Sequence, residues 1–158
     1  MDIAQLVPDD WAVFRALRIA ALSEAPYAFG STLDGEQRLG EADWRTRLAT
    51  RVQFVVRDEG RAPVGTIGAY RDGDGEVIEL VSMWVAPAVR GHGVGAALVE
   101  RVVAHARELG CCEVRLWVTE GNAGAERLYA RCGFVRTGGV QPIRPGEPGN
   151  EVEMLRVL

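Results

Sequence analysis

The feature that most constrains the fold is a glycine-rich turn between two apolar stretches, with three glycines in residues 91–95. Residues 76–86 before the turn predict a strand, and residues 94–109 predict a helix because apolar positions recur every four residues. Free N–H groups at a helix N-terminus carry about half a positive charge, and glycine lets an anion approach them closely. The turn therefore predicts a phosphate or pyrophosphate cradle, to which Arg90 adds a guanidinium.

Two other phosphate-binding loops fit this turn less well. The loop G-x-x-x-x-G-K-[ST] requires a lysine, and this chain contains none. Gly91, Gly93 and Ala96 match the dinucleotide fingerprint G-x-G-x-x-[GA], but that loop normally opens a parallel doubly wound sheet. Here an antiparallel meander precedes the turn, although Glu120 after the next strand imitates the acid that binds ribose. A dinucleotide-dependent oxidoreductase therefore stays open as a minor alternative.

Hydrophobic periodicity and turn residues place the other elements in a single domain, residues 1–158. The second turn of the meander, 72–75, is a strong hairpin signal because glycine accepts positive φ without cost. The fold class is α/β of the α+β type, with a mixed, mostly antiparallel central sheet of six to seven strands and about four flanking helices. In the order βααβββαβαββ, the predicted strands are 2–7, 52–57, 62–71, 76–86, 112–119, 134–137 and 150–157, and the predicted helices are 8–22, 36–49, 94–109 and 123–132.

Composition argues against several function classes. The formal net charge is -4 and the pI is about 5.3, with no basic cluster, which argues against a nucleic-acid partner. No apolar run approaches the roughly 20 residues that span a bilayer, and the N-terminus lacks the pattern of a signal peptide. Cys111, Cys112 and Cys132 form neither a disulfide framework nor a metal-ligand spacing, and reduced cysteines indicate a cytoplasmic location.

Two blocks of this sequence resemble the hallmark motifs of the GNAT superfamily of N-acetyltransferases. Residues 90–95 fit the acetyl-CoA motif R-x-x-G-x-G, and residues 83–87 before them resemble its lead-in L-x-V-x-P. Residues 122–134 resemble the second hallmark, N-x-x-A-x-x-x-Y-x-x-x-G-F. Two motifs in the expected order are much more specific than either alone. The resemblance is sharpest over 79–134 and includes a weaker match to a substrate-side loop that ends at Ser31.

This resemblance implies acetyl-CoA as cofactor and direct transfer of the acetyl group to an amine, without a covalent acyl-enzyme. In the superfamily the fourth strand is bulged and splays from the fifth, so that the pantetheine arm pairs with the backbone at Met83 and Val85. One N–H there polarises the thioester carbonyl. The implied cofactor-binding residues are Met83, Trp84, Val85, Arg90, Gly91, His92, Gly93, Val94, Gly95, Ala96, Asn122, Ala125 and Tyr129.

The resemblance also implies that Tyr129 is the general acid that protonates the leaving thiolate. Asn122 and Tyr129 are seven residues apart, about two helical turns, so they share one face of their helix. Asn122 is placed to cap that helix. The competing interpretation is a tyrosine that only packs in the core or at its rim.

The general base is less well defined by the sequence. An amine with a pKa near 10.4 is only about one part in 10³ free base at pH 7, so a carboxylate or a water chain can help. Glu79 is the first candidate, because strand alternation places it on one face with Met83 and Val85. Glu120 is the second candidate. The competing interpretation is that both glutamates are solvated charges at strand ends.

The acceptor is an amine whose identity stays open between small molecules and proteins. Tyr27 and Phe29, in the loop 25–32, either line the acceptor pocket or cover the core, and Glu120 is a further candidate substrate contact. A homodimer is plausible by family habit, with neither nucleic acid nor membrane as a partner. A non-catalytic acyl-CoA-binding module on the same fold is the second alternative function.

Overall fold

The computed structural model describes residues 1–72 and 75–158, so the centre of the hairpin turn predicted at 72–75 lies outside the described residues. The strands are β1 (Asp2–Gln5), β2 (Val52–Arg57), β3 (Pro63–Asp72), β4 (Val77–Val85), β5 (Glu113–Thr119), β6 (Val135–Pro142) and β7 (Asn150–Val157). The α-helices are α1 (Trp11–Glu24), α2 (Leu33–Gln37), α3 (Glu41–Thr50), α4 (Val94–Glu108) and α5 (Ala123–Arg131). Short 3-10 helices occupy Pro8–Asp10, Pro26–Ala28 and Pro87–Val89.

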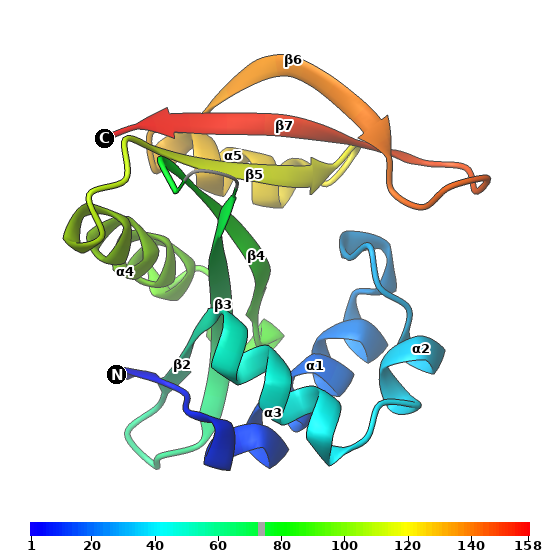
Figure 1. Cartoon of the computed structure of the whole chain (residues 1–158), viewed down its shortest axis with the longest axis vertical. Helices are drawn as coiled ribbons and strands as arrows, with labels where there is room; N and C mark the ends of the chain where they lie inside the picture. The colour runs from blue at the N-terminus through cyan, green and yellow to red at the C-terminus, as the bar shows by residue number, and fades with distance from the viewer. Residues whose placement is uncertain (73–74) are drawn as a thin grey trace.

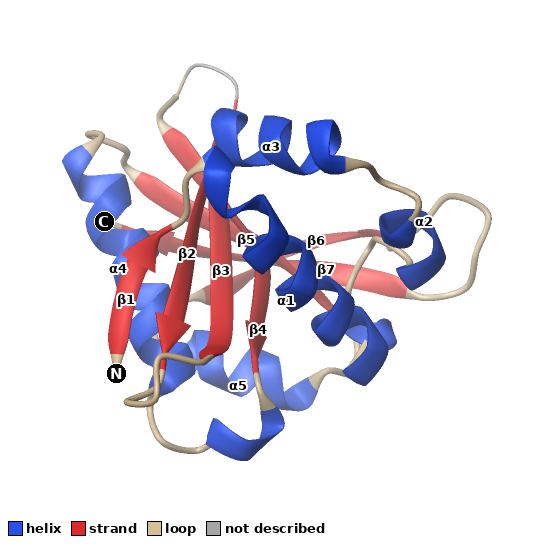
Figure 2. Ribbon diagram, turned by 90° about the horizontal axis from the view of Figure 1, so that it is seen from below, coloured by secondary structure: helices blue, strands red, loops and turns tan. Residues whose placement is uncertain are grey.

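The strands form one sheet in the order β1-β2-β3-β4-β5-β7-β6. Among the described strand pairs, β4 and β5 run parallel and all the others run antiparallel, which confirms the predicted mixed sheet. Helix α4 makes the crossover between the two parallel strands. Helices α1 to α3 cover one face of the sheet, and α4 and α5 cover the other (Figure 1, Figure 2).

The hydrophobic core lies on both faces of the sheet. On the α4 side, Leu98 of the predicted apolar stripe belongs to one core cluster with Phe54 and Ile67, and all three side chains are fully buried. On the opposite side, Phe14 of α1 meets Trp44 of α3 edge to face, with 5.3 Å between the ring centroids. Burial of large apolar side chains on both faces fixes the helices against the sheet.

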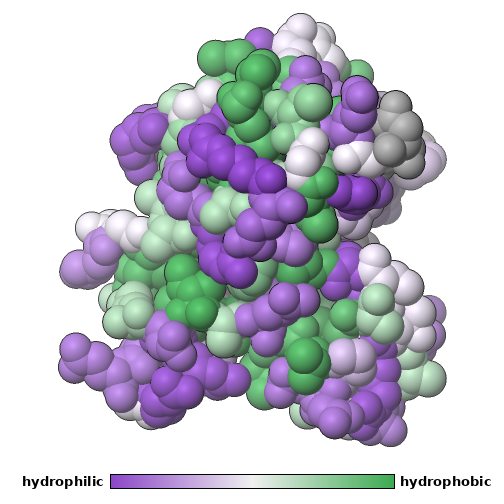
Figure 3. Space-filling view, turned by 60° about the vertical axis from the view of Figure 1, so that its left-hand side comes forward, coloured by the Kyte–Doolittle hydropathy of each residue, from purple (hydrophilic) through white to green (hydrophobic). Residues whose placement is uncertain are grey.

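The outer surface is largely polar on the face that Figure 3 shows. Hydrophilic side chains predominate there, and hydrophobic side chains form separate small patches among them. Within the described residues, none of the helices combines the length and the apolar character that crossing a membrane would require.

The single helix predicted at 36–49 is wrong, because the structure divides this stretch between α2 and α3. Gly40 is extended, with φ of −91° and ψ of 175°, and its N–H donates to the Asp43 carboxylate at 2.9 Å. A second helix therefore begins with its own cap. The apolar spacing of Leu39, Trp44 and Leu48 continues across this break and concealed the cap in the sequence.

The closing hairpin is longer than predicted, because β6 continues beyond residue 137. The register with β7 shifts around Gly138, which takes a φ of 93°. A bulge of this kind keeps a strand paired through glycine-rich sequence that predicts a loop. The remaining connection, 143–149, is tethered by Arg144, whose Nη1 donates to the Gly30 carbonyl at 3.2 Å.

Truncating Phe54 tests how strongly the core under α4 holds the sheet. Because Phe54 is 0% exposed, we expect Phe54→Ala to lower the free energy of unfolding by about 3–5 kcal/mol. Val135→Ala, at a side chain that is 65% exposed, should cost less than about 1 kcal/mol. Urea unfolding followed by circular dichroism measures both, and equal losses for the two variants would contradict the assignment of the core.

Candidate functional site

Strand β4 carries a β-bulge that changes the side on which its side chains project. Two residues, Ser82 and Met83, oppose Ile67 of β3, and Ser82 adopts a φ of 54°. The prediction that Glu79 shares a face with Met83 and Val85 is therefore wrong, because one extra residue interrupts the alternation. Met83 and Val85 pack toward the core under α4, whereas Glu79 lines a cavity on the face that α1 to α3 cover.

Strands β4 and β5 separate immediately after a short paired region. The ladder joins Val77–Glu79 to Glu113–Arg115 and then ends, and Figure 1 shows the two strands diverging. Over the residues that the structure describes, the backbone at 83–85 has no ladder partner in β5. On the β5 side, the backbone groups of this stretch other than the Val85 carbonyl, which Arg90 engages, can therefore pair with an extended ligand, as the resemblance implied for the pantetheine arm.

A groove of about 840 Å³ runs from this opening to the N-terminus of α4 and along α5. His92 does not line it; its exposed ring lies with Nδ1 2.9 Å from the Arg90 carbonyl oxygen. Tyr27, predicted at the acceptor pocket, lines this groove instead. The other predicted cofactor residues all line it: Met83, Trp84, Val85, Arg90, Gly91, Gly93, Val94, Gly95, Ala96, Asn122, Ala125 and Tyr129.

The glycine turn leaves the first turn of α4 open to this groove. Gly91 and Gly93 take φ of 79° and 82°, and a Cβ at either position would meet no described atom within 4 Å. Glycine is needed there for the left-handed backbone rather than for lack of space. Gly95 is different, because a Cβ would lie 2.9 Å from Leu128 Cδ2 and 3.2 Å from Met83 Cε. That glycine therefore allows α4 to approach α5 and β4 closely.

Arg90 is held in place by Glu24, the last residue of α1. Its Nη1 and Nη2 donate to the two carboxylate oxygens at 3.1 and 2.7 Å, and its Nε donates to the Val85 carbonyl at 2.9 Å. Trp84 Nε1 also donates to Glu24, at 3.0 Å. In this arrangement Arg90 ties the glycine turn to α1 and β4, and its contact with a pyrophosphate stays a prediction.

The sequence did not point to Glu24 as a site residue. Its partner Arg90 is 66 positions away, so no local spacing relates the two. The hydrogen bonds from Arg90 and then Trp84 lower the pKa of Glu24 below its ordinary value, and the Arg90 charge adds to this effect. Glu24 is therefore ionised throughout the neutral range and keeps the turn fixed.

Asn122 and Tyr129 lie on the groove side of α5, as predicted. Asn122 caps the helix, because its Oδ1 accepts a hydrogen bond from the Ala125 N–H at 3.3 Å. Tyr129 is 7% exposed and packs edge to face against Phe134, with 6.0 Å between the ring centroids. Burial raises the pKa of the Tyr129 hydroxyl above its ordinary value. The hydroxyl therefore stays protonated at neutral pH, as a proton donor must.

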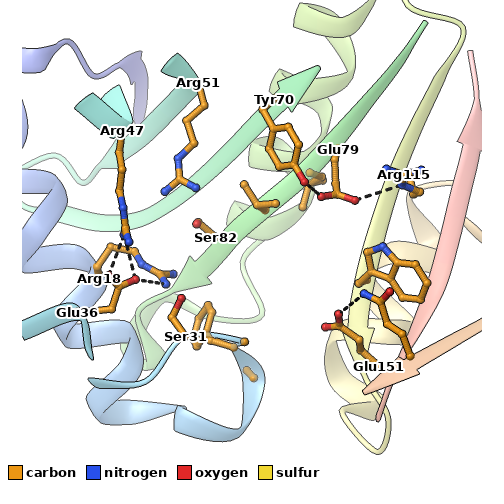
Figure 4. Close-up of a pocket in the computed structure, with 17 residues that line it drawn as sticks. Arg18, Ser31, Glu36, Arg47, Arg51, Tyr70, Glu79, Ser82, Arg115 and Glu151 are labelled. Carbon is orange, nitrogen blue, oxygen red and sulfur yellow. Dashed lines mark hydrogen bonds and ion pairs between the residues drawn. The ribbon is translucent and has the colours of Figure 1, made fainter. Parts of the chain in front are cut away.

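A second cavity, of about 700 Å³, lies on the opposite face of β4, between α1, α3 and the strands (Figure 4). Phe29 lines it and also belongs to a buried cluster with Ala21 and Leu22, so its role as an acceptor-pocket residue stays a prediction. Ala28 and Trp117 line both this cavity and the groove on the α4 side. The two spaces therefore meet where β4 and β5 separate.

Glu79 lies at the last paired position of β4 and is 8% exposed in the second cavity. The Tyr70 hydroxyl donates to one of its carboxylate oxygens, and Arg115 Nε donates to the other at 3.2 Å. Glu120, the second candidate base, is exposed beyond β5 and lines neither cavity. Of the two candidate bases, Glu79 thus lines a cavity and Glu120 does not, and the role of a general base stays a prediction.

An arginine cluster in the second cavity was missed by the sequence analysis. Arg18 Nη2 and Arg47 Nη1 both reach Glu36, each at 2.9 Å, and Arg18 is only 4% exposed. Burial alone would raise the pKa of Glu36, but hydrogen bonds from Arg47 and Arg18 outweigh it and hold the pKa below its ordinary value. The available signal was the position of Arg18 within the apolar stripe of α1, next to Leu17.

Comparisons with known proteins agree with this geometry. A family model described as the acetyltransferase (GNAT) family matches residues 16–134. An uncharacterized N-acetyltransferase of Mycobacterium tuberculosis is 35% identical over 109 residues, which cover 68% of each chain. A mycothiol acetyltransferase of Thermobispora bispora is 31% identical over 80% of this chain and 43% of its own length. An acetyltransferase structure from Salmonella typhimurium, solved with acetyl-CoA, has a TM-score of 0.77 at 24% identity and covers 100% and 94% of the two chains.

Replacing Glu24 with glutamine tests the link between α1 and the glycine turn. A carboxylate whose pKa is lowered by folding stabilises the native state fully above its ordinary pKa near 4.5, and this stabilisation is lost as the pH falls through the lower folded-state value. We expect Glu24→Gln to lower the free energy of unfolding by roughly 0.5–1 kcal/mol at pH 7.

The difference should shrink as the pH falls below 4.5, and urea unfolding at a series of pH values measures it. Glu59→Gln, at an exposed position in the turn between β2 and β3, provides the matched control. A pH-independent difference for Glu24→Gln would argue against the ion pair with Arg90.

Proposed function

Because this chain belongs to the acetyltransferase (GNAT) family and is an acetyl-CoA-dependent N-acetyltransferase, we propose that it transfers the acetyl group directly to a primary amine of a small molecule or protein. The observation that carries this proposal is the meeting of two cavities at Ala28 and Trp117. One cavity approaches from the α4 and α5 side, the other from the α1 and α3 side. A cofactor and an acceptor can therefore meet at the opening in the sheet without sharing an entrance.

The residues of the α4-side groove fit acetyl-CoA, which supplies the thioester from which the acetyl group is transferred. Backbone N–H groups of the glycine turn and of the first turn of α4 are placed to hold its pyrophosphate. The backbone of residues 83–85, which has no ladder partner on the β5 side, is placed to bind the extended arm, as a neighbouring strand would. A backbone N–H in this stretch would stabilise the charge that develops on the thioester oxygen.

Tyr129 is proposed as the general acid. The amine nitrogen forms a bond with the acetyl carbon, the carbon–sulfur bond breaks, and the sulfur leaves with the electron pair. The Tyr129 hydroxyl gives its proton to that sulfur. Two observations support this role. Tyr129 lines the groove on the same side of α5 as the capping Asn122. Its raised pKa keeps the hydroxyl protonated until the thiolate forms.

Glu79 is proposed to receive the proton that the amine loses. It lies in the acceptor cavity and is ordered by Tyr70 and Arg115. Met83 is four residues further along β4, roughly 13 Å at about 3.3 Å per residue. Glu79 would therefore act through cavity water rather than by direct contact with the attacking nitrogen.

The two alternative functions differ in their support. The sheet, with its one parallel pair among the described strands, is unlike the doubly wound parallel sheet of dinucleotide-binding folds, which argues against an oxidoreductase. A non-catalytic acyl-CoA-binding module would release no thiol. A thiol-release assay with acetyl-CoA over a panel of amines tests this directly, and titration with NADH provides the comparison for the oxidoreductase.

Two further expectations accompany this function. Cys111, Cys112 and Cys132 are free thiols, which supports work in a reducing compartment such as the cytoplasm. The expected homodimer stays a prediction, which sedimentation equilibrium tests.

The substitution Tyr129→Phe removes the hydroxyl that is the proposed proton donor and keeps the aromatic ring. We expect kcat to fall by about 10²- to 10⁴-fold, since this is the range that general acid catalysis contributes. Calorimetric titration with CoA should give the same dissociation constant as for the unaltered chain, because the ring remains in the groove. A kcat within about threefold of the unaltered enzyme would remove Tyr129 from the mechanism.

Glu79→Gln tests the proposed base through its pH dependence. If Glu79 accepts the proton, the variant should lose or shift the acid limb of the profile of kcat/KM against pH. Glu59→Gln, at an exposed turn position, controls for a general change in charge. An unchanged acid limb in Glu79→Gln would reject the assignment and leave water alone as the base.

A further inference from the structure

The acceptor cavity has a helical wall with excess positive charge. Arg18 of α1, Arg47 of α3 and Arg51, which follows α3, project from this wall together with Glu36 of α2 (Figure 4). Arg18 and Arg47 share Glu36 as their anion. Three guanidinium groups thus face one carboxylate on this side of the cavity.

The opposite wall of the cavity, which the strands form, carries excess negative charge. Arg115 is neutralised there by Glu79, 3.2 Å from its Nε, and by Glu153 at 3.9 Å. Glu151 accepts a hydrogen bond from the Gln141 amide at 2.7 Å, and among the described residues it has no ion pair with a cation. The strand wall therefore presents a negative charge to the cavity, and the two walls together are bipolar.

Arg51 is the least compensated cation of the helical wall, because Glu36 acts on it only from beyond ion-pair distance. Its Nε is buried without a hydrogen-bond partner, and its side-chain guanidinium forms no ion pair with any described residue. The Cζ atom lies 5.4 Å from the centre of the Phe14 ring, which supports one side of the group. Figure 4 shows the guanidinium pointing into the cavity, toward Ser82.

This arrangement is costly for the protein alone. Burial, and after it the neighbouring charges of Arg47 and Arg18, outweigh the charge of Glu36 and lower the pKa of Arg51 to about 10, so the group remains protonated at pH 7. Arg51 is half-buried, and its Nε has lost water without gaining a hydrogen-bond partner. Arg18 Nε is a second buried donor without a partner on the same wall. Both observations indicate that an anion arrives with the ligand.

We propose that the acceptor is an amine that also carries a carboxylate, as an amino acid does, and that Arg51 binds this carboxylate. The inference rests on the proposed function and names the substrate class of the same cavity. A guanidinium presents its donors in a planar fork that matches a carboxylate, and one such fork neutralises one carboxylate. The amine end lies toward Trp117, where the cavity meets the groove for the cofactor.

The strand wall supports the same orientation of the acceptor. Before it reacts, the amine is almost entirely in its cationic form at neutral pH. Glu79 and Glu151 lie on the side where this cation would stand. A polyamine would instead place positive charges against three arginines, which costs free energy through like-charge repulsion. The bipolar cavity thus selects zwitterions over polycations.

Matched acceptors test this proposal in turnover. Amino acids are compared with the amides of the same amino acids, which keep the amine and the side chain but lack the carboxylate charge. We expect Arg51→Gln to lower kcat/KM for the acids by about 10- to 100-fold, and for the amides by less than about threefold. Arg51→Lys, which keeps the charge but not the fork, should recover part of the loss for the acids.

Arg38→Gln is the matched control, because the Arg38 side chain is 78% exposed on the surface. Comparing each variant with the unaltered enzyme on the same acceptor cancels the different intrinsic reactivities of acid and amide. A similar loss on both acceptor classes, or no loss on the acids, would overturn the proposal. Circular dichroism and CoA titration of Arg51→Gln establish that the variant is folded.

A binding measurement separates this inference from the proposed function. N-acetyl amino acids and their amides are titrated into the unaltered chain and into Arg51→Gln with CoA present, and tryptophan fluorescence reports their binding. If no amine is acetylated but the N-acetyl acids bind in an Arg51-dependent way, the proposed function fails and the carboxylate site stands. Equal binding of acids and amides to the unaltered chain would overturn the carboxylate site even if acetyl transfer is observed.

Discussion

The separation of β4 from β5 beyond Glu79 is the constraint on which both halves of the site depend. Three paired positions hold the two strands together, and the remaining backbone of β4 faces an opening. The bulge at Ser82 and Met83 then distributes the side chains. Without the extra residue, Glu79 and Met83 would project to the same side of the sheet. With it, Met83 lines the groove beside α4 and Glu79 lines the cavity on the opposite face, so one strand contributes to both spaces.

The two halves of the site use different physical means of recognition. The groove beside α4 offers backbone donors at a helix N-terminus, and the guanidinium of the glycine turn, Arg90, is engaged by Glu24. Backbone amides are held by the fold itself and need no side chain to be ordered on binding. The acceptor cavity instead relies on charged side chains from α1, α2 and α3, among them Glu36, which can differ between chains that share the same sheet.

The sequence predicted the features that are determined by residues close together in the chain. The apolar stripe of α4, the glycine turn and the cap at Asn122 each lie within a few residues of chain, where spacing determines geometry. The sequence analysis missed features that depend on contacts between residues far apart in the chain. The bulge in β4 arises from its register with β3, and Glu24 meets a partner 66 residues away. A cap at Gly40 was also concealed, because the apolar spacing runs through it.

The positive charge of the helical wall of the cavity links the stability of the ligand-free protein to ligand binding. A protonated Arg51 without a bound anion weakens the native state, because the charge of Glu36 offsets its partial desolvation only in part. A carboxylate that enters the cavity relieves this cost and binds only the folded chain, so it adds stability in proportion to the logarithm of its concentration. The same residue would therefore lower stability in the absence of the acceptor and favour the acceptor over neutral amines. Replacement by an apolar residue would remove the cost and the selectivity together, which gives a physical reason to keep a half-buried cation after the end of α3.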